Sequence, residues 1–143
     1  MKEKKTHELV GSLIGNLVGL AVVNSVLLWR PLTHGVVLSS WVDVLWAANL
    51  SLLVQVAGRA VLAFYRPAGF YAFMEMVIAA LGLVGVIVFY EVFPLDFGAV
   101  GEPWLNTAVK IVLWVGMAGA AIGTVVWLVR LLAGRGYDGQ EAR

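Results

Sequence analysis

Four long apolar runs alternate with short polar or proline-containing breaks along the 143-residue chain. Each run has about 20 residues or more, which at about 1.5 Å per residue lets a helix cross a hydrocarbon core of roughly 30 Å. Backbone amides inside lipid find hydrogen-bonding partners only within their own helix, so runs of this kind cross a membrane as helices. The pattern predicts an all-α, polytopic membrane protein, a single domain with a bundle of four transmembrane helices at about residues 8–29, 36–65, 70–93 and 104–132.

The breaks contain Pro31, Pro67 and Pro103, and proline is found where helices end or begin. The first run follows the lysines of residues 2–5, as the apolar part of a secretory signal does. It continues to Trp29, however, without the small-residue cleavage site that a signal requires. We therefore expect the first run to be kept as a spanning helix.

Composition supports a membrane protein and limits its chemistry. Apolar residues make up 61% of the chain and charged residues only 13%, whereas soluble domains carry about 25% charge. The net charge of +1 and the absence of a long basic run argue against a nucleic acid partner. Cysteine is absent, and His7 and His34 lie outside the apolar runs, so we predict no metal site, haem or other cofactor.

Catalytic signatures are missing as well. The sequence has no metalloprotease, nucleophile-elbow, phosphate-loop or dinucleotide-binding motif. We therefore predict no catalytic residues and no enzyme activity.

The positive residues are distributed unequally between the two sides that four crossings define. Two of the ten, Arg30 and Lys110, fall on the side opposite the termini. Because positively charged loops stay in the cytoplasm, both short termini are predicted to be cytoplasmic, in an inner or plasma membrane. The eight positive residues on the predicted cytoplasmic side are Lys2, Lys4, Lys5, Arg59, Arg66, Arg130, Arg135 and Arg143.

Charged residues within spanning helices are costly and need a partner or a path to water. Asp43 and Lys110 are predicted to lie about two turns inside the second and fourth helices, at similar depth. We therefore expect them to form a salt bridge. The pair would act as a staple that fixes the helix register or, less favoured, as a gate in a solute path.

A second polar group is expected nearer the cytoplasm. Gln55, Arg59 and Arg66 share one side of the second helix, and Glu75 on the third helix can reach either arginine. The arginines could extend to lipid headgroups with Glu75 as a loose partner, or they could form a site for an anion or a headgroup phosphate. Asn16, Asn24 and Asn49 are expected to form hydrogen bonds between helices.

Small residues spaced about one helical turn apart allow helices to approach closely in lipid. They occur on the first helix and on the fourth helix. The favoured interpretation is packing within the chain, and the alternative is an interface with other copies or with a larger complex. The glycines concerned are Gly11, Gly15 and Gly19 in the first helix and Gly116, Gly119 and Gly123 in the fourth.

Two functions are consistent with these features. The first is a structural or accessory subunit, in contact with the lipid bilayer and with itself or other membrane subunits. The second is a small channel or transporter for ions or small solutes, with Asp43, Gln55, Arg59, Glu75 and Lys110 around its path. The short loops and missing catalytic groups favour the first.

Overall fold

The computed structural model describes residues 2–65 and 67–134. Each of its four long helices contains a stretch long and apolar enough to cross a membrane. The all-α fold with four transmembrane helices predicted from the sequence is therefore confirmed. The helices are α1 (Lys2–Trp29), α2 (Trp41–Phe64), α3 (Ala68–Val92) and α4 (Trp104–Leu132), and two short 3-10 helices, η1 (Arg30–Thr33) and η2 (Phe97–Val100), follow α1 and α3.

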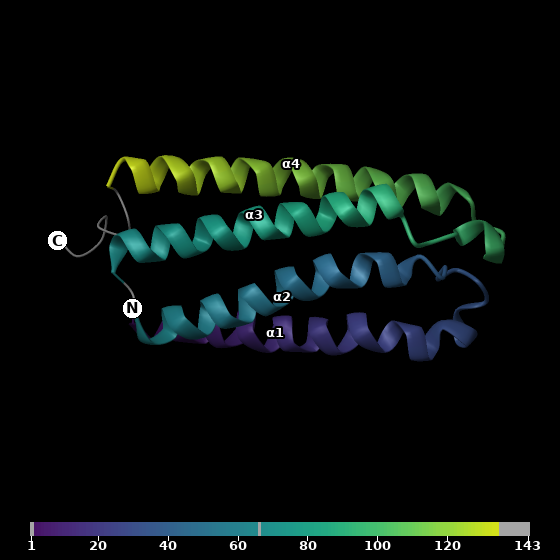
Figure 1. Ribbon diagram of the computed structural model, residues 1–143, viewed down its shortest axis with the longest axis horizontal. Coiled ribbons are helices and arrows are strands. Elements are labelled where there is room, and N and C mark those ends of the chain that lie inside the picture. Colours follow the sequence, from purple (N-terminus) through teal and green to yellow (C-terminus); the bar gives the residue numbers. More distant parts are fainter. Residues whose placement is uncertain (1, 66, 135–143) are drawn as a thin grey trace.

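The four helices stand side by side in chain order (Figure 1). Consecutive helices contact each other, whereas no Cα atom described for α1 lies within 8 Å of one in α3 or α4, and the same holds between α2 and α4. Thus α2 and α3 are inner helices, and α1 and α4 are edge helices. Most of the buried apolar side chains accordingly come from the inner pair: Val44, Ala47, Leu62, Ala72 and Ile78.

The two ends of the bundle differ. We call the end where α1 begins and α4 finishes the terminal end, and the end that carries η1 and η2 the loop end (Figure 1). At the loop end, Leu38 N–H donates to the Pro94 carbonyl over 3.0 Å, and Asp96 N–H donates to the Val36 carbonyl over 2.7 Å. These bonds join the α1–α2 connection to the α3–α4 connection, so the loop end is held by backbone hydrogen bonds as well as by helix packing.

Helix boundaries agree with the sequence expectation for α4 and differ elsewhere. The helix α1 begins at Lys2, since the polar residues before the apolar run continue the same helix. The helix α2 begins at Trp41 rather than near residue 36, because Gly35 has a positive φ of 88° and residues 36–38 bond to the other connection. At 24 residues, α2 is about 36 Å long and requires no unusual tilt. Arg66 and the tail after Gly134 lie outside the described residues.

Candidate functional site

An ion pair joins the two inner helices in the half of the bundle nearer the terminal end. Arg59 Nη1 on α2 donates to Glu75 Oε1 on α3. The Glu75 side chain is only 8% exposed and that of Arg59 is 22% exposed. Tyr71, one turn before Glu75, interacts with both charged groups. Each charge thus has its counter-charge where protein and lipid replace water, which is the arrangement that makes an intramembrane charge tolerable.

The ion pair continues a polar stripe on α2. Ser51, Gln55 and Arg59 are spaced four residues apart, so their side chains emerge from the same side of the helix. The Gln55 Nε2 donates to Ser51 Oγ over 3.2 Å. Ser51 also lies 3.6 Å from the position that a Cβ would take at Gly85, so α3 approaches this stripe closely. The stripe therefore follows the α2–α3 interface from the middle of α2 to the ion pair.

This geometry bears on the roles that the sequence left open for Arg59. An anion site requires a positive charge that is free to attract the ligand, and here Glu75 neutralises the guanidinium. Loose pairing at headgroup depth would leave Glu75 exposed, and Glu75 is buried. The contacts thus favour a staple between α2 and α3. Arg66, the second arginine expected near Glu75, lies outside the described residues.

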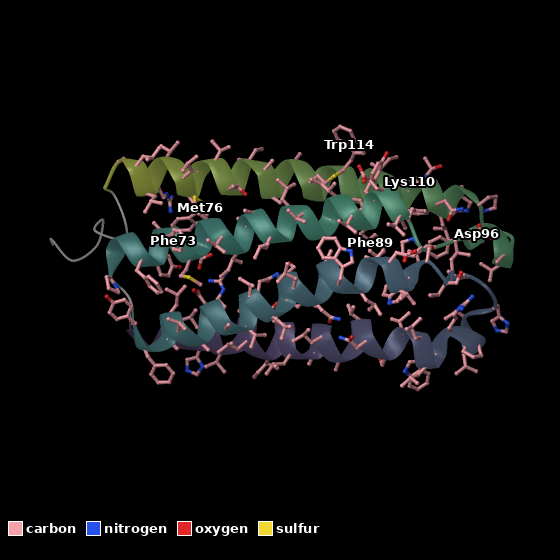
Figure 2. The ribbon with its side chains drawn as sticks, in the orientation of Figure 1. Phe73, Met76, Phe89, Asp96, Lys110 and Trp114 are labelled. Carbon is pink, nitrogen blue, oxygen red and sulfur yellow. The ribbon has the colours of Figure 1, made fainter. Side chains whose placement is uncertain are left out.

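The expected Asp43–Lys110 salt bridge is not formed. Among the described residues, Arg59 and Glu75 are the only basic and acidic side chains whose nitrogen and oxygen atoms come within 4.0 Å of each other. The reason is the order of the helices, because α3 separates α2 from α4 and no Cα atoms of α2 and α4 come within 8 Å. Lys110 Nζ lies 4.7 Å from the centroid of the Phe93 ring, a cation–π contact near the loop end (Figure 2). Asp43 lies in the first turn of α2, where the positive end of the helix dipole stabilises a carboxylate.

Most of the glycines expected to pack within the chain face open space. A Cβ added at Gly19 would lie 3.4 Å from a Leu52 methyl group, so this glycine does pack between α1 and α2. The favoured interpretation, packing within the chain, is therefore wrong for the others, because no described atom lies close to the positions that their Cβ atoms would take. A Cβ would meet no atom within 4 Å at Gly11 and Gly15 on α1 or at Gly116, Gly119 and Gly123 on α4.

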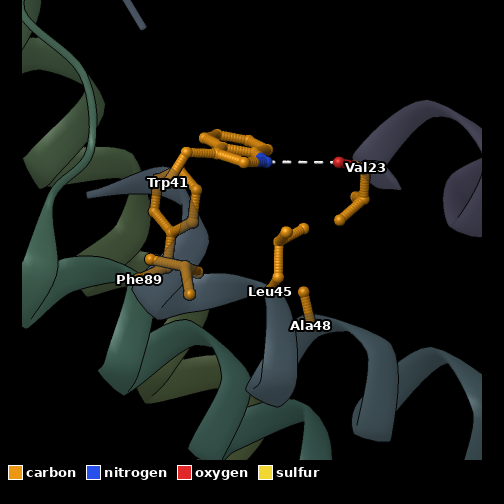
Figure 3. A pocket seen from close by; sticks show the side chains of 6 residues that line it. Val23, Trp41, Leu45, Ala48 and Phe89 are labelled. Carbon is orange, nitrogen blue, oxygen red and sulfur yellow. Dashed lines mark hydrogen bonds between the residues drawn. The ribbon is translucent and has the colours of Figure 1, made fainter. Parts of the chain in front are cut away.

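Polar contacts attach α1 to its neighbour α2. Asn24 and Asn49 exchange two side-chain hydrogen bonds between α1 and α2, of 2.6 and 3.0 Å. Trp41 donates from its indole nitrogen to the Val23 carbonyl of α1 over 3.2 Å and lies edge-on to Phe89 of α3, beside a cavity of about 50 Å³ (Figure 3). Two of the three asparagines expected to bond between helices, Asn24 and Asn49, thus do so, and the Trp41 indole adds a third hydrogen bond between α1 and α2.

The two glycines that pack between α2 and α3, Gly58 and Gly85, were not predicted from the sequence. A Cβ at Gly58 on α2 would come within 2.8 Å of Met74 Cε and 3.1 Å of Ile78 Cδ1 on α3. Gly85 is the corresponding small residue on α3, opposite Ser51. The available signal was the spacing of Ala47, Ser51 and Gly58, which places three small residues on one side of the second helix.

The polar groups between the inner helices bind one another in two pairs, Gln55 with Ser51 and Arg59 with Glu75. Ser51 receives its hydrogen bond from an amide, which cannot remove the hydroxyl proton, so this contact does not activate a nucleophile. In the part of the chain that the structure describes, no three His, Asp or Glu side chains are placed to hold a metal ion. Comparisons with protein-family models, with curated proteins and with solved structures find no match to this chain.

Proposed function

We propose that this membrane protein is a structural or accessory subunit that assembles through the open glycine face of α4, defined by Gly116, Gly119 and Gly123. The observation that carries the proposal is that a Cβ at any of these positions would meet nothing within 4 Å. Gly58 and Gly85 of the inner helices are enclosed by neighbouring atoms, whereas the three glycines of α4 leave room for another backbone.

The physics of helix association in lipid supports this function. Apolar side chains gain little by leaving lipid for protein, so helices associate through close packing, which glycine permits. The helix α4 touches α3 along one side and has no buried residue, so most of its surface is free for such a contact. On the other edge helix, Gly11 and Gly15 provide a second, smaller face of the same kind. A subunit with small-residue faces at both edges suits a homo-oligomer or a place between other membrane subunits.

The proposal includes an orientation. The first residue of α1 and the last residue of α4 lie at the same end of the bundle (Figure 1). By the four crossings predicted from the sequence, eight of the ten lysines and arginines fall on the side of the termini, which supports cytoplasmic termini in an inner or plasma membrane. Labelling of single cysteines in intact cells tests this, because a cysteine at Val100 in η2 is expected to react with an impermeant maleimide and one at Gly134 is not. The opposite pattern would overturn the orientation.

Native mass measurement tests the function directly. The full chain is extracted in a mild detergent, and its mass and co-purifying proteins are determined for the wild type and for Gly119→Leu. We expect a complex larger than one chain, which Gly119→Leu dissociates because a leucine side chain holds the helices apart. The matched control is Ala118→Leu, which adds the same group at an exposed position about 100° around α4 from Gly119.

Two results would contradict the proposal. A wild-type protein that is monomeric and free of partners in lipid has no assembly to join. A monomer that conducts ions in liposomes and loses conduction on Glu75→Gln would replace the subunit by the small channel or transporter.

A further inference from the structure

A groove with a volume of about 370 Å³ lies between α2, α3 and α4. Its lining extends on α2 from Val44 to Gln55 and on α3 from Gly82 to Phe89, and Leu113 of α4 closes part of the third side. Eleven residue steps along α2 make the groove about 16 Å long, parallel to the helices. Its volume is within the range of about 300 to 1,000 Å³ that small-molecule sites occupy.

Two polar residues interrupt the apolar lining. Ser51 and Gln55 lie near the centre of α2, and so near the middle of the bilayer if the helix crosses it. A glutamine amide has two N–H donors and a carbonyl oxygen that accepts. Gln55 gives one donor to Ser51, and no described residue donates to its Oε1. The groove thus offers an open donor and an open acceptor where hydrocarbon supplies neither.

We infer that this groove binds a neutral, mainly hydrocarbon molecule that carries one hydroxyl or carbonyl group, bonded to the Gln55 amide. The lining contains no charged residue, and the nearby Arg59 is neutralised by Glu75, so a neutral ligand is favoured. Elongation along the helices suits a chain that lies parallel to the lipid tails. Phe89 provides an apolar ring at the end of the groove nearer the loops.

The groove fits such a molecule better than it fits a helix of a second copy. A packed helix would contact its neighbour over the full membrane thickness, whereas the groove occupies about half the length of α2. The glycines that meet nothing within 4 Å on α1 and α4 are not part of its lining. The inferred site is therefore independent of the proposed assembly, and either can fail without the other.

Photolabelling tests the inference on the full chain in phosphatidylcholine vesicles. The probe is hexadecanol with a diazirine in mid-chain, and the reference probe is the same diazirine in hexadecane. We expect hexadecanol to label the peptides containing residues 44–55 and 82–89 about three to ten times more than hexadecane does, as a hydrogen bond of about 0.6 to 1.4 kcal/mol in lipid implies. Excess unlabelled hexadecanol should suppress this labelling, and unlabelled hexadecane should not.

Variants separate the hydrogen bond from the space. Gln55→Leu is expected to reduce hexadecanol labelling to the hexadecane level. Gly82→Leu is expected to remove labelling by both probes, because its Cβ meets nothing within 4 Å and its side chain extends into the groove. Ala57→Leu, at an exposed position of α2 outside the lining, serves as the control and should label like the wild type.

Three results would overturn the inference: equal labelling by both probes in the wild type, labelling unchanged in both groove variants, or inter-copy cross-linking of Gly82→Cys without labelling by either probe. The last would show that the groove is an interface between copies. The competition experiment uses the wild type alone, so the test stands even where a variant fails to fold.

Discussion

The α2–α3 interface and the outward face of α4 are both rich in glycine, but the surroundings of those glycines are opposite. At the inner interface, a Cβ at Gly58 would press on Met74 and Ile78. On α4, a Cβ at Gly116 would meet nothing within 4 Å. The inner interface also contains the Arg59–Glu75 pair, whereas Lys110, about two turns into α4, lies over the Phe93 ring near the loop end.

This difference shows what each region contributes. Glycine at the inner interface lets two helices of the same chain approach, and the polar stripe between them fixes their register. Gly116, Gly119 and Gly123 on α4 have no close neighbour among the described residues, and in the proposed assembly another helix packs against them. Spacing of small residues alone therefore identifies a packing surface without identifying what packs against it.

The largest expected effect comes from breaking the ion pair. Glu75→Leu leaves the Arg59 charge without its partner and is expected to cost about 3 to 5 kcal/mol of stability. The double variant Arg59→Leu and Glu75→Leu should recover most of this loss, since no charge then remains. Unfolding by SDS titration, followed by circular dichroism, measures both. If the double variant were less stable than Glu75→Leu alone, the two charges would not act by neutralising each other.

Overpacking the inner interface should have the next largest effect. Gly58→Leu places a side chain against Met74 and Ile78 and is expected to destabilise the fold by about 1 to 3 kcal/mol. The matched variant Gly116→Leu adds the same side chain to open space and should leave the stability of the isolated chain nearly unchanged. The same SDS titration compares them. Equal losses at the two positions would remove the distinction between inner and outer glycines.

The attachment of α1 should be of intermediate strength. Asn49→Leu removes both hydrogen bonds to Asn24, and polar bonds of this kind contribute about 0.6 to 2 kcal/mol between membrane helices. The control Asn106→Leu removes an amide at the loop end that does not contact α1. Hydrogen exchange of the α1 amides should rise in Asn49→Leu and stay unchanged in Asn106→Leu. Unchanged exchange in both would show that the asparagine pair is not needed to hold α1.

The smallest effect is expected for the charges that do not pair. Asp43→Asn and Lys110→Gln lie on helices without close approach, so their stability changes should add to within about 0.3 to 0.5 kcal/mol. A double-mutant cycle by SDS titration measures the coupling. A larger coupling energy would show that Asp43 and Lys110 do interact, against the helix order seen in the structure.

The fold could be predicted from the sequence because its determinant is local. Each apolar run must satisfy its own amides within lipid, and this fixes four helices, with α4 at the predicted residues 104–132. The start of α2 could not be predicted from the local pattern, because the hydrogen bonds that hold the preceding residues join distant parts of the chain: Asp96 to Val36 and Leu38 to Pro94.

Of the two ion pairs expected between helices, one forms and one does not, because the sequence pattern gives the depth of a residue but not which helices are neighbours. Depth along the chain placed Arg59 near Glu75, and these residues lie on consecutive helices. Depth also suggested Asp43 near Lys110, but periodicity contains no information on which helices are neighbours. Likewise, the spacing of Gly116, Gly119 and Gly123 marks a packing face, and only the surroundings of these glycines show that no described residue packs against it.

Cross-linking in native membranes tests the central claim, that the inner interface holds the chain together and the α4 face holds chains to one another. The chain has no cysteine, so a single one can be introduced without removing others. Under mild oxidation or a short bifunctional maleimide, Gly119→Cys is expected to form a dimer or a covalent adduct with a partner subunit. Ala47→Cys, at a residue that is 2% exposed in the inner interface, should remain a single chain. Cross-linking at Ala47→Cys, or none at Gly119→Cys, would contradict the account.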